Sequence, residues 1–376
     1  MFNAIDKLLK TSPGLTGREI AKHFDIDKKK VNSFLSRNKH LFQQTDEFKW
    51  YQSKNREFEL SFAPVSWMTQ DHFEDALIER GNPFDGTYKS AVITFPKDCS
   101  LMMVAIARML SLLNQLSSKN IAVTIDLSKS KKTSSFLNRS GFFDLLHQDI
   151  TVLPSRPEPG SSAALKYQDN SHSLVEFGAI KLNSTDAEIG QLIQRLGKRF
   201  VTAASKDYFH IIMTVFSEFI HNVKEHSDSR IPGFAALQSY NGWQGKHIQT
   251  VISDSGVGLV ATLRATLKEN YPELDAQFPV GSPHSDVELV KHVFSNGRIS
   301  RYGSKGGRGL GFESSRKQAS KNEALLIIRQ TTFSIEQRYK DGRLLSSTVR
   351  NDLSLINGTH ICFDFFIDTS EDIGLI

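Results

Sequence analysis

The spacing of apolar residues in the first 57 positions predicts three short helices and a hairpin. Apolar residues four apart within 4–9 lie on one face of a first helix. Thr16 and Glu19 have the spacing of a capping box, which marks the start of a second helix. Asp27 is the expected cap of a third helix. Over 42–51, apolar and polar residues alternate around a central acidic pair, as in a hairpin.

The middle of the chain, 58–160, alternates between apolar runs typical of buried strands and apolar residues at helical spacing. The expected elements, in chain order, are a strand at 90–95, a helix at 101–116, a strand at 121–127 and a helix at 133–146. This order predicts an α/β domain with a partly parallel sheet. Prolines and glycines in 154–172 indicate a linker.

The C-terminal part, 173–376, has the same mixture of elements in a larger domain. The expected elements are a helix at 207–226, strands at 234–238 and 248–252, a helix from 260 onward, and strands at 323–330, 333–339 and 360–367. The segment 300–306 is rich in glycine and basic residues and predicts a mobile lid. The chain is therefore expected to be an α/β protein of three domains.

The formal charge of +5 lies entirely in the N-terminal segment. Residues 1–57 contain 12 Lys and Arg against 7 Asp and Glu, and the rest of the chain is neutral. A polyanion partner is therefore expected for this segment alone. No apolar run approaches the roughly 20 residues that a membrane span needs, and the N-terminus lacks the pattern of a signal peptide. Two cysteines are too few for a disulfide scaffold, so a cytoplasmic protein with reduced, buried thiols is expected.

Three short helices followed by a hairpin resemble a winged helix-turn-helix domain over 1–57. In that family the third helix enters the major groove of DNA and the wing contacts the backbone. The resemblance implies DNA contacts by Lys28, Lys29, Lys30, Asn32, Ser33 and Arg37 on the third helix, and by Lys49 on the wing. Winged helices also serve as protein-docking modules, so a protein partner is the alternative.

The run from 121 to 146 resembles the STAS-like domains found beside ATP-binding domains in some bacterial regulators. In the better-known STAS proteins, a serine at a helix start accepts a phosphoryl group within an Asp-Ser-Ser-Gly pattern. This chain lacks that pattern and offers only Ser134 and Ser135. The expected role of 58–160 is therefore docking of a partner or spacing, with a phosphoacceptor as the alternative.

Two groups of polar residues in the C-terminal part have spacings that suit a nucleotide. Glu218 and Asn222 are four apart and share one face of the 207–226 helix. A carboxylate and an amide so placed can hold an attacking water and Mg²⁺ side by side. Asp254 follows a strand and precedes Gly256 and Gly258, so it can accept the 6-amino group of adenine while the backbone approaches the ring. The alternatives are a solvated helix face and an ordinary tight turn.

A third glycine patch precedes a predicted helix start. It consists of Gly307, Arg308, Gly309, Leu310 and Gly311. Glycine amides at a helix N-terminus can cradle phosphate. No Gly-Lys-Ser/Thr follows, which excludes a Walker A loop, and no strand leads into the patch at Rossmann spacing. A fourth patch, Gly358-Thr359, precedes the last strand.

The order and spacing of the four patches resemble the GHKL ATPases, which include histidine kinases, gyrase B, Hsp90, MutL and anti-sigma-factor kinases. The resemblance covers about half of the chain and implies the Bergerat α/β sandwich, with a mixed sheet, binding ATP and Mg²⁺. It implies Asn222 as metal ligand, Asp254 as adenine reader and Glu218 as the base that activates water. The other nucleotide contacts that it implies are Gly256, Gly258, Gly307, Gly309, Leu310, Gly311 and Thr359. Lys305 and Arg308 are candidates for the γ-phosphate by position and charge.

Three functions remain open at this point. The first is an ATP-hydrolysing regulator whose nucleotide state controls the N-terminal domain, in a bacterial stress or anti-phage response. The second is a serine or histidine kinase of the anti-sigma-factor type, and the third is a non-hydrolysing ATP sensor. No two-helix segment with a phosphoacceptor histidine precedes Glu218, and the presence of Glu218 favours turnover over sensing. The chain ends soon after the last strand, which disfavours a strand-passage or mismatch-repair machine. A homodimer stays open as an assembly.

Overall fold

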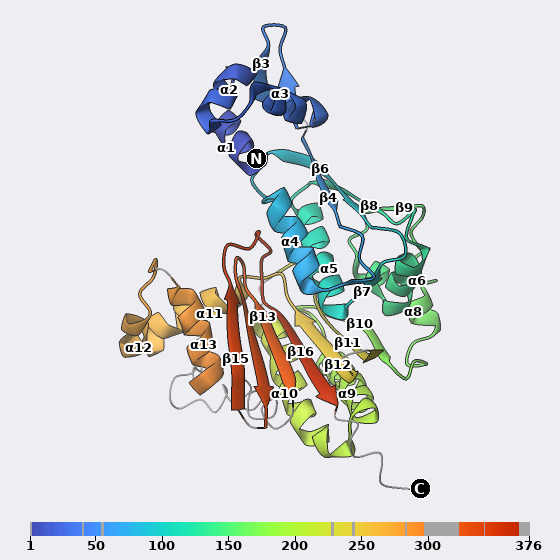
Figure 1. The fold of residues 1–376 in the computed structure, drawn as a ribbon. Coiled ribbons are helices and arrows are strands. Elements are labelled where there is room, and N and C mark those ends of the chain that lie inside the picture. The colour runs from blue at the N-terminus through green and yellow to red at the C-terminus, as the bar shows by residue number, and fades with distance from the viewer. Residues whose placement is uncertain are drawn as a thin grey trace.

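The computed structural model consists of three units that follow one another from one end of the molecule to the other (Figure 1). The structure describes residues 2–39, 41–53, 56–226, 229–242, 245–282, 284–296, 323–341 and 343–367. A small helical unit at one end is followed by a parallel sheet with helices and then by a large antiparallel sheet (Figure 1). The expected organisation, an α/β chain with several sheets, is confirmed.

The N-terminal unit has the elements that its apolar spacing predicts. They are α1 (Phe2–Thr11), β1 (Leu15–Thr16), α2 (Gly17–Phe24), α3 (Lys28–Arg37), β2 (Phe42–Gln44) and β3 (Lys49–Gln52). The capping box at Thr16 and Glu19 is present, and the Asp27 carboxylate accepts from the backbone N–H groups of Lys29 and Lys30 at 2.8 and 3.1 Å. The three strands form a small sheet in the order β1-β3-β2. The three helices and the hairpin are therefore confirmed as elements.

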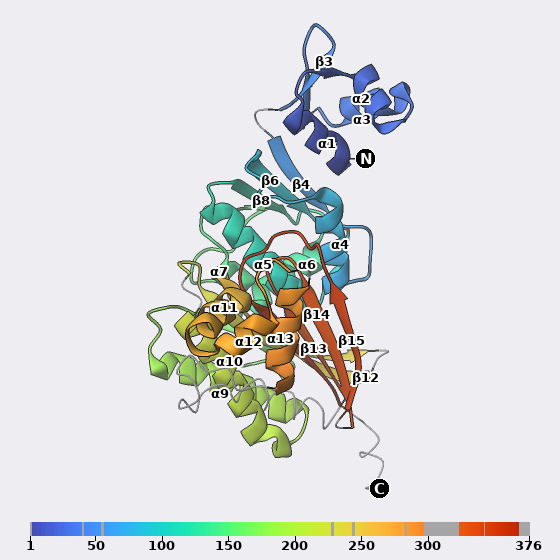
Figure 2. The same ribbon diagram turned by 90° about the vertical axis from the view of Figure 1, so that its left-hand side faces the viewer.

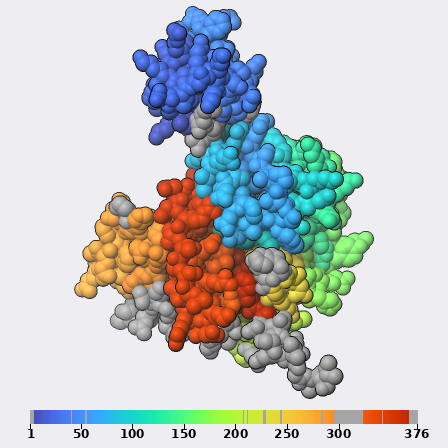
Figure 3. All heavy atoms as spheres, in the orientation of Figure 1, coloured from blue at the N-terminus to red at the C-terminus, as the bar shows by residue number. Residues whose placement is uncertain are grey.

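Buried polar contacts attach the N-terminal unit to the middle of the chain. The guanidinium of Arg56 pairs with Asp6 of α1 at 2.9 Å, and the Arg56 side chain is fully buried. The amide of Gln52 donates to the same carboxylate at 2.9 Å. In the space-filling view this unit projects from one end of the molecule (Figure 3). Its outer surface is thus available to a partner without rearrangement of the other two units.

The middle unit is built on a four-stranded sheet in the order β4-β6-β8-β9, in which every pair of neighbours is parallel. Its elements are β4 (Arg56–Ser61), β5 (Trp67–Met68), α4 (Gln70–Arg80), β6 (Tyr88–Thr94), β7 (Ser100–Leu101), α5 (Met103–Ser118), β8 (Ala122–Asp126), α6 (Lys131–Ser140), α7 (Phe142–Leu145), β9 (Thr151–Leu153) and α8 (Ala163–Lys166). The predicted strand–helix–strand–helix order and the parallel pairing are confirmed.

Several details of the middle unit differ from the sequence expectation. The sequence predicted no element at β5, α4, β7 or β9, and the expected linker at 154–172 contains α8. β4 starts at Arg56, so the last two residues counted with the N-terminal segment belong to a strand of the parallel sheet. The single helix expected at 133–146 is divided into α6 and α7. The division occurs at Gly141, whose φ of 83° is left-handed and ends α6.

The C-terminal unit contains a seven-stranded sheet with helices beside it (Figure 1). Its helices are α9 (Asp186–Ala203), α10 (Phe209–His226), α11 (Gly258–Asn270), α12 (Pro272–Gln277) and α13 (Ser285–Asn296). Its strands are β10 (Leu174–Ile180), β11 (Gly233–Gly242), β12 (Gly245–Ser253), β13 (Ala324–Arg329), β14 (Ser334–Lys340), β15 (Arg343–Arg350) and β16 (His360–Ile367). The sequence predicted no element at β10, α9, α12, α13 or β15, and the expected elements that fall within the described residues are present.

The mixed sheet implied by the GHKL resemblance is wrong for the described residues. The strand order is β10-β11-β12-β16-β13-β14-β15, and all six neighbouring pairs are antiparallel. β12 and β13 run in the same direction, but the last strand, β16, lies between them and is antiparallel to both. Strands that run in the same direction are everywhere separated by an antiparallel neighbour, so these seven strands form no parallel pair.

Both faces of the C-terminal sheet are covered. Ala235 and Leu237 of β11 pack into the cluster formed with α9 and α10, whereas Phe234 and Ala236 point the other way, into the cluster that contains α5. α5 contacts β8 of the parallel sheet and β11, β12 and β16 of the antiparallel sheet. Residues 103–116 of α5 are all buried, as expected for a helix between two sheets.

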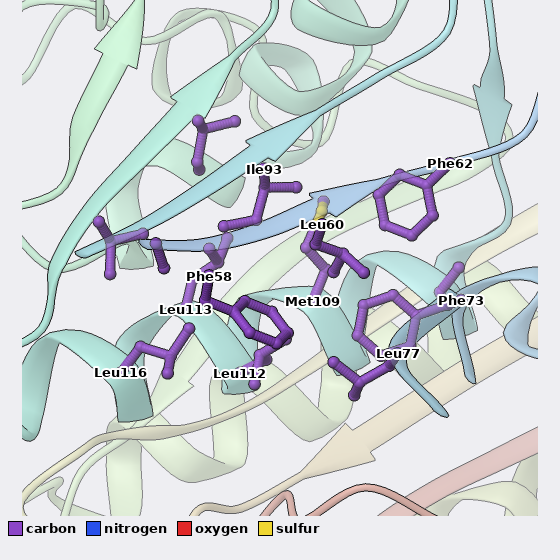
Figure 4. Packing of buried hydrophobic residues seen from close by; sticks show 14 of the residues in the cluster. Phe58, Leu60, Phe62, Phe73, Leu77, Ile93, Met109, Leu112, Leu113 and Leu116 are labelled. Atoms are coloured by element: carbon purple, nitrogen blue, oxygen red, sulfur yellow. The ribbon is translucent and has the colours of Figure 1, made fainter. Parts of the chain in front are cut away.

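The close-up in Figure 4 shows one side of this packing. Met109, Leu112 and Leu113 of α5 gather with Phe58 and Ile93 of the parallel sheet. A helix that is apolar on nearly all sides has no solvated face and must be enclosed by the protein. The middle unit and the C-terminal unit therefore share one hydrophobic core through α5. Figure 2 shows α5 from the side, between the strands of the middle unit and the C-terminal sheet.

Two further expectations concern the environment of the chain. Among the helices of the described part, none combines the length and the apolar content that a membrane crossing requires. Cys99 and Cys362 are both free and buried, as predicted.

Candidate functional site

The candidate site is built around Asp254, at the point where β12 ends. Register pairing of β12 with β16 ends at Ser253 opposite His360, so the residues that follow β12 lie beside the residues that precede β16. The backbone N–H of Asp254 donates to the carbonyl of Thr359 at 3.0 Å. The Asp254 carboxylate accepts from the N–H of Gly256 at 2.7 Å and from the N–H of Thr359 at 3.2 Å. Two of the predicted patches therefore meet, although they are about a hundred residues apart in the chain.

Burial makes the Asp254 carboxylate an unusual group. Its residue is 7% exposed, and burial raises the pKa of Asp254 to about 6, against the opposing effect of the hydrogen bonds from Gly256 and Thr359. A buried carboxylate is tolerated only when its oxygens are hydrogen-bonded. At neutral pH the carboxylate is therefore ionised and only accepts hydrogen bonds, so it suits a ligand that donates N–H groups.

Two glycines permit this close approach of the chain segments. Gly358 has a φ of +95°, and a Cβ placed on it would lie 2.1 Å from the carbonyl oxygen of Asp254. Gly258 has a φ of +82°, and its Cβ would meet the carbonyl oxygen of Gly358 at 3.3 Å. Only glycine fits both positions without movement of the backbone. Gly258, which the sequence predicted to contact the ring, and Gly358 of the fourth patch thus bring the Asp254 and Thr359 segments together.

Thr359 also determines where α11 begins. Its hydroxyl oxygen accepts from the N–H of Leu259 at 2.8 Å, which satisfies one of the free donors in the first turn of α11. The next N–H, that of Val260, faces the Gln330 side-chain oxygen at 3.5 Å. Val257, which lies between Gly256 and Gly258, is 53% exposed. The loop between β12 and α11 is therefore held at both ends while part of it is exposed.

The helix that carries Glu218 and Asn222 passes close to this loop. A Cβ on Gly233 would lie 2.4 Å from Cγ1 of Val223 on α10, 2.9 Å from the carbonyl oxygen of Ser253, and 3.7 Å from Cα of Asp254. Gly233 therefore lies between Val223 of α10 and the backbone at Asp254. Because Val223 follows Asn222 directly, this part of α10 is close to the loop after β12. Glu218 and Asn222 are both half-buried. α10 is fixed by Phe219, whose ring centroid lies 5.2 Å from that of Phe363 on β16.

The chemistry of these side chains fits a nucleotide with Mg²⁺. The Asp254 carboxylate suits an amino group, and the amide oxygen of Asn222 is a hard ligand of the kind that Mg²⁺ accepts alongside phosphate oxygens and waters. Within the described ranges no group of three or more His, Cys, Asp or Glu residues could hold a metal by itself. The expected lid at 300–306 and the phosphate patch fall outside the described residues, namely Lys305, Gly307, Arg308, Gly309, Leu310 and Gly311.

The residues predicted to contact DNA lie on α3 and, for Lys49, on β3. Lys28, Lys29, Lys30, Ser33 and Arg37 are exposed. Asn32 is half-buried instead, because it packs against α2, where a Cβ on Gly17 would lie 1.9 Å from its side-chain oxygen. The ammonium of Lys49 on β3 pairs with Glu47 at 2.7 Å. Four of the exposed basic residues predicted to contact DNA therefore lie on one helix.

Sequence reasoning missed four residues that support the loops of the site: Gln115, Ser255, Gln330 and Asn357. Ser255 lies inside the Asp254–Gly258 patch and Asn357 directly precedes Gly358, so proximity to a predicted residue was the available signal. Gln115 belongs to an apolar helix of another unit, and Gln330 lies at the end of a buried strand. Neither has a local pattern that would identify it, because its role depends on contacts distant in the chain.

Comparisons with known proteins give little further information. No protein-family model and no curated protein matches the chain. Among solved structures, the chain is similar to the B subunit of the DNA gyrase from Myxococcus xanthus, with 10% sequence identity and a TM-score of 0.20. That similarity covers 48% of this chain and 44% of the gyrase chain. The chain thus spans less than half of that protein's length.

Proposed function

We propose that this protein is an ATP- and Mg²⁺-binding regulator of the GHKL type that hydrolyses ATP and controls a DNA- or protein-binding N-terminal unit. The observation that carries the proposal is the pairing of Asp254 with Thr359, which joins two of the four patches at the end of β12. A nucleotide site of this kind requires an acceptor carboxylate and close backbone approach at one place, and both are present there.

Recognition of adenine would rest on Asp254. An ionised carboxylate accepts hydrogen bonds and donates none, and hydrogen bonds from Gly256 and Thr359 orient its two oxygens. The remaining lone pairs suit the 6-amino group of adenine. Guanine carries a carbonyl oxygen at that position, which a carboxylate repels. The site is therefore expected to prefer ATP to GTP.

Hydrolysis would depend on the polar face of α10. Asn222 would hold Mg²⁺ through its amide oxygen, and Glu218, one turn earlier, would accept the proton of the attacking water. When bound, Mg²⁺ would neutralise negative charge on the phosphate oxygens. Lys305, Arg308 and the glycines at 307, 309 and 311 remain the predicted phosphate contacts.

The N-terminal unit would be the part under control. Its excess of basic residues and the exposed lysines of α3 favour a polyanion such as DNA, and a protein partner is the alternative. ATP can control such a unit only if ATP binds two arrangements of the chain with different affinities. DNA affinity measured with and without ATP therefore tests the regulatory part of the proposal.

The catalytic part is tested with the full chain and [γ-³²P]ATP, separating free phosphate from labelled protein. The proposal expects free phosphate from the wild type, and a loss of about 10²-fold or more in turnover for Glu218→Gln with little change in ATP affinity. Glu225→Gln is the matched control, because Glu225 is an exposed carboxylate two turns further along the same helix. It should retain turnover.

Each other result favours a different function. Label on the protein favours the kinase, and ATP binding without either product favours the sensor. Equal turnover by the wild type and Glu218→Gln would refute the role of Glu218. Absence of ATP binding, measured by calorimetry on folded protein, would refute the proposal as a whole.

A further inference from the structure

A side chain of the middle unit reaches the loops of the candidate nucleotide site. Gln115 lies on α5 and is 3% exposed. Its amide nitrogen donates to the hydroxyl of Ser255 and to the carbonyl of Asn357, both at 3.0 Å. Its amide oxygen accepts from the N–H of Asn357 at 2.8 Å. One buried amide therefore uses both of its ends on the C-terminal unit.

The two partners of Gln115 belong to the two segments that form the site. Ser255 follows Asp254 directly, and Asn357 precedes Gly358 and Thr359. The distance between the β12–α11 loop and the segment before β16 is thus set from two directions. Within the C-terminal unit, Asp254 and Thr359 bond to each other. From the middle unit, Gln115 connects the same two segments on their other side.

A second group of buried side chains anchors the same segment to the middle unit. Glu74 of α4 pairs with Arg108 of α5 at 2.8 Å and with Arg329 at the end of β13 at 3.1 Å. Arg329 also donates to the carbonyl of Ile356 at 2.8 Å and to the carbonyl of Ser354. The hydroxyl of Ser354 donates back to Leu77 of α4 at 3.1 Å. Contacts with α4, α5 and Arg329 of β13 therefore add to the backbone hydrogen bonds that Leu353 and Ile356 make with Thr332 and Thr331.

These contacts cannot change independently. The amides and charges are buried, and a buried polar group that loses its partner destabilises the structure more than an exposed one does. A shift of α5 relative to the C-terminal sheet would have to move Asn357 and Ser255 as well, or break three hydrogen bonds. Movement of α5 would thereby alter the geometry of Asp254 and Thr359.

We propose that Gln115 is a positioning residue for the nucleotide site, through which α5 of the middle unit sets the geometry that reads adenine. This inference rests on the proposed function. Because coupling between two sites is reciprocal, a partner that moves α5 would change ATP affinity, and ATP would change the affinity for that partner by the same factor. The middle unit is then part of the nucleotide site, and a spacer role does not describe it fully.

The test compares Gln115→Leu with Asn114→Leu in the full chain. Asn114 is the adjacent residue on α5 and is 5% exposed. It also makes two hydrogen bonds, with the carbonyl of Leu145 and the N–H of His147, but both stay within the middle unit. The two variants should lower the melting temperature by similar amounts. Calorimetry with ATP and with GTP, each with Mg²⁺, then measures affinity and base preference.

The expected result is a roughly tenfold weaker ATP affinity for Gln115→Leu, corresponding to about 1.4 kcal/mol, with little change for GTP and hence a reduced preference for adenine. Asn114→Leu should keep the wild-type preference. A general loss of stability would not change the ratio of ATP to GTP affinity, so this ratio separates positioning from structural support.

The other outcomes are equally informative. If both variants retain the wild-type ratio, the inference is refuted while the proposed function stands. If the folded wild type binds no ATP, the proposed function fails and the inference fails with it. If Gln115→Leu does not fold, Ser255→Ala decides, because it removes one of the three hydrogen bonds of Gln115. A decrease of about twofold or more in the ratio of ATP to GTP affinity supports the inference, and an unchanged ratio refutes it.

Discussion

Replacement of Gly358 by alanine tests the geometry of the site most directly. Gly358 has a φ of +95°, in the region that favours glycine, and its added Cβ would lie 2.1 Å from the carbonyl oxygen and 2.9 Å from the side-chain oxygen of Asp254. A Cβ and an oxygen do not approach so closely in folded proteins. The two segments would have to separate by about 1 Å, and a displacement of that size is enough to impair a pre-organised site.

The loss of stability expected for Gly358→Ala has two contributions. Left-handed backbone destabilises a residue with a Cβ by about 1–2 kcal/mol. Forcing an extra methyl group into a packed place adds about 1–3 kcal/mol. Gly358→Ala is therefore expected to lower the free energy of unfolding by about 2–5 kcal/mol. It should also weaken ATP binding by at least about tenfold, because the Thr359 N–H moves away from the Asp254 carboxylate.

Two glycines of the same chain serve as controls. Gly160 has a φ of +77° with nothing within 4 Å of an added Cβ, so Gly160→Ala carries the backbone strain without the steric overlap. Gly242 has open space and no left-handed φ, so Gly242→Ala carries neither. Urea denaturation of the three variants separates the two parts, and calorimetry on the folded protein measures ATP binding.

The order of the results is decisive. Gly358→Ala should be the least stable, Gly160→Ala should lose about 1–2 kcal/mol, and Gly242→Ala should stay close to the wild type. If Gly358→Ala were no less stable than Gly160→Ala, the close approach of the two segments would be refuted. If it lost stability but bound ATP with wild-type affinity, the adenine role of this pairing would be refuted.

Three further predictions concern charge. Burial raises the pKa of Asp254 to about 6 from 3.8, so the native state binds the proton more tightly than the unfolded state does. As the pH rises from about 4 to 6, the free energy of unfolding should therefore fall by roughly 3 kcal/mol relative to Asp254→Asn, which urea denaturation at several pH values measures. ATP affinity should rise over the same range, and a difference in stability that does not change with pH would contradict the prediction. Glu74→Leu should lower the free energy of unfolding by about 3–5 kcal/mol, because the buried Arg108 and Arg329 lose their counter-charge. Asp75→Ala removes an exposed partner of Arg350 and should lower it by only about 0–1 kcal/mol. Equal losses in denaturation would contradict the buried network. Alanine at the three lysines of 28–30 should lower DNA affinity and reduce the salt dependence of log K by about 0.9 for each phosphate that the protein no longer neutralises; an unchanged slope in fluorescence anisotropy would favour protein docking.

Local elements were predictable where short-range chemistry defines them. The capping box at Thr16 and the cap at Asp27 appear as expected, because both depend on residues within three positions. The strands β12 and β16 were predictable from runs rich in apolar residues, since both faces of each are buried, although Gln249, Thr250 and Asp364 interrupt these runs. β15 was not predictable, because it lies at the edge of the sheet and is largely exposed, so its sequence has no alternation.

The sequence by itself therefore determined many of the elements, the charge asymmetry and the identity of the four patches, because propensity, capping and composition act over a few residues. Only the tertiary structure decided which of them meet. It placed β16 between β12 and β13, which brings Thr359 against Asp254 and makes the sheet antiparallel. It also placed Gln115 of α5 on both loops. Such contacts depend on the packing of two sheets around one buried helix, and no local spacing encodes that arrangement.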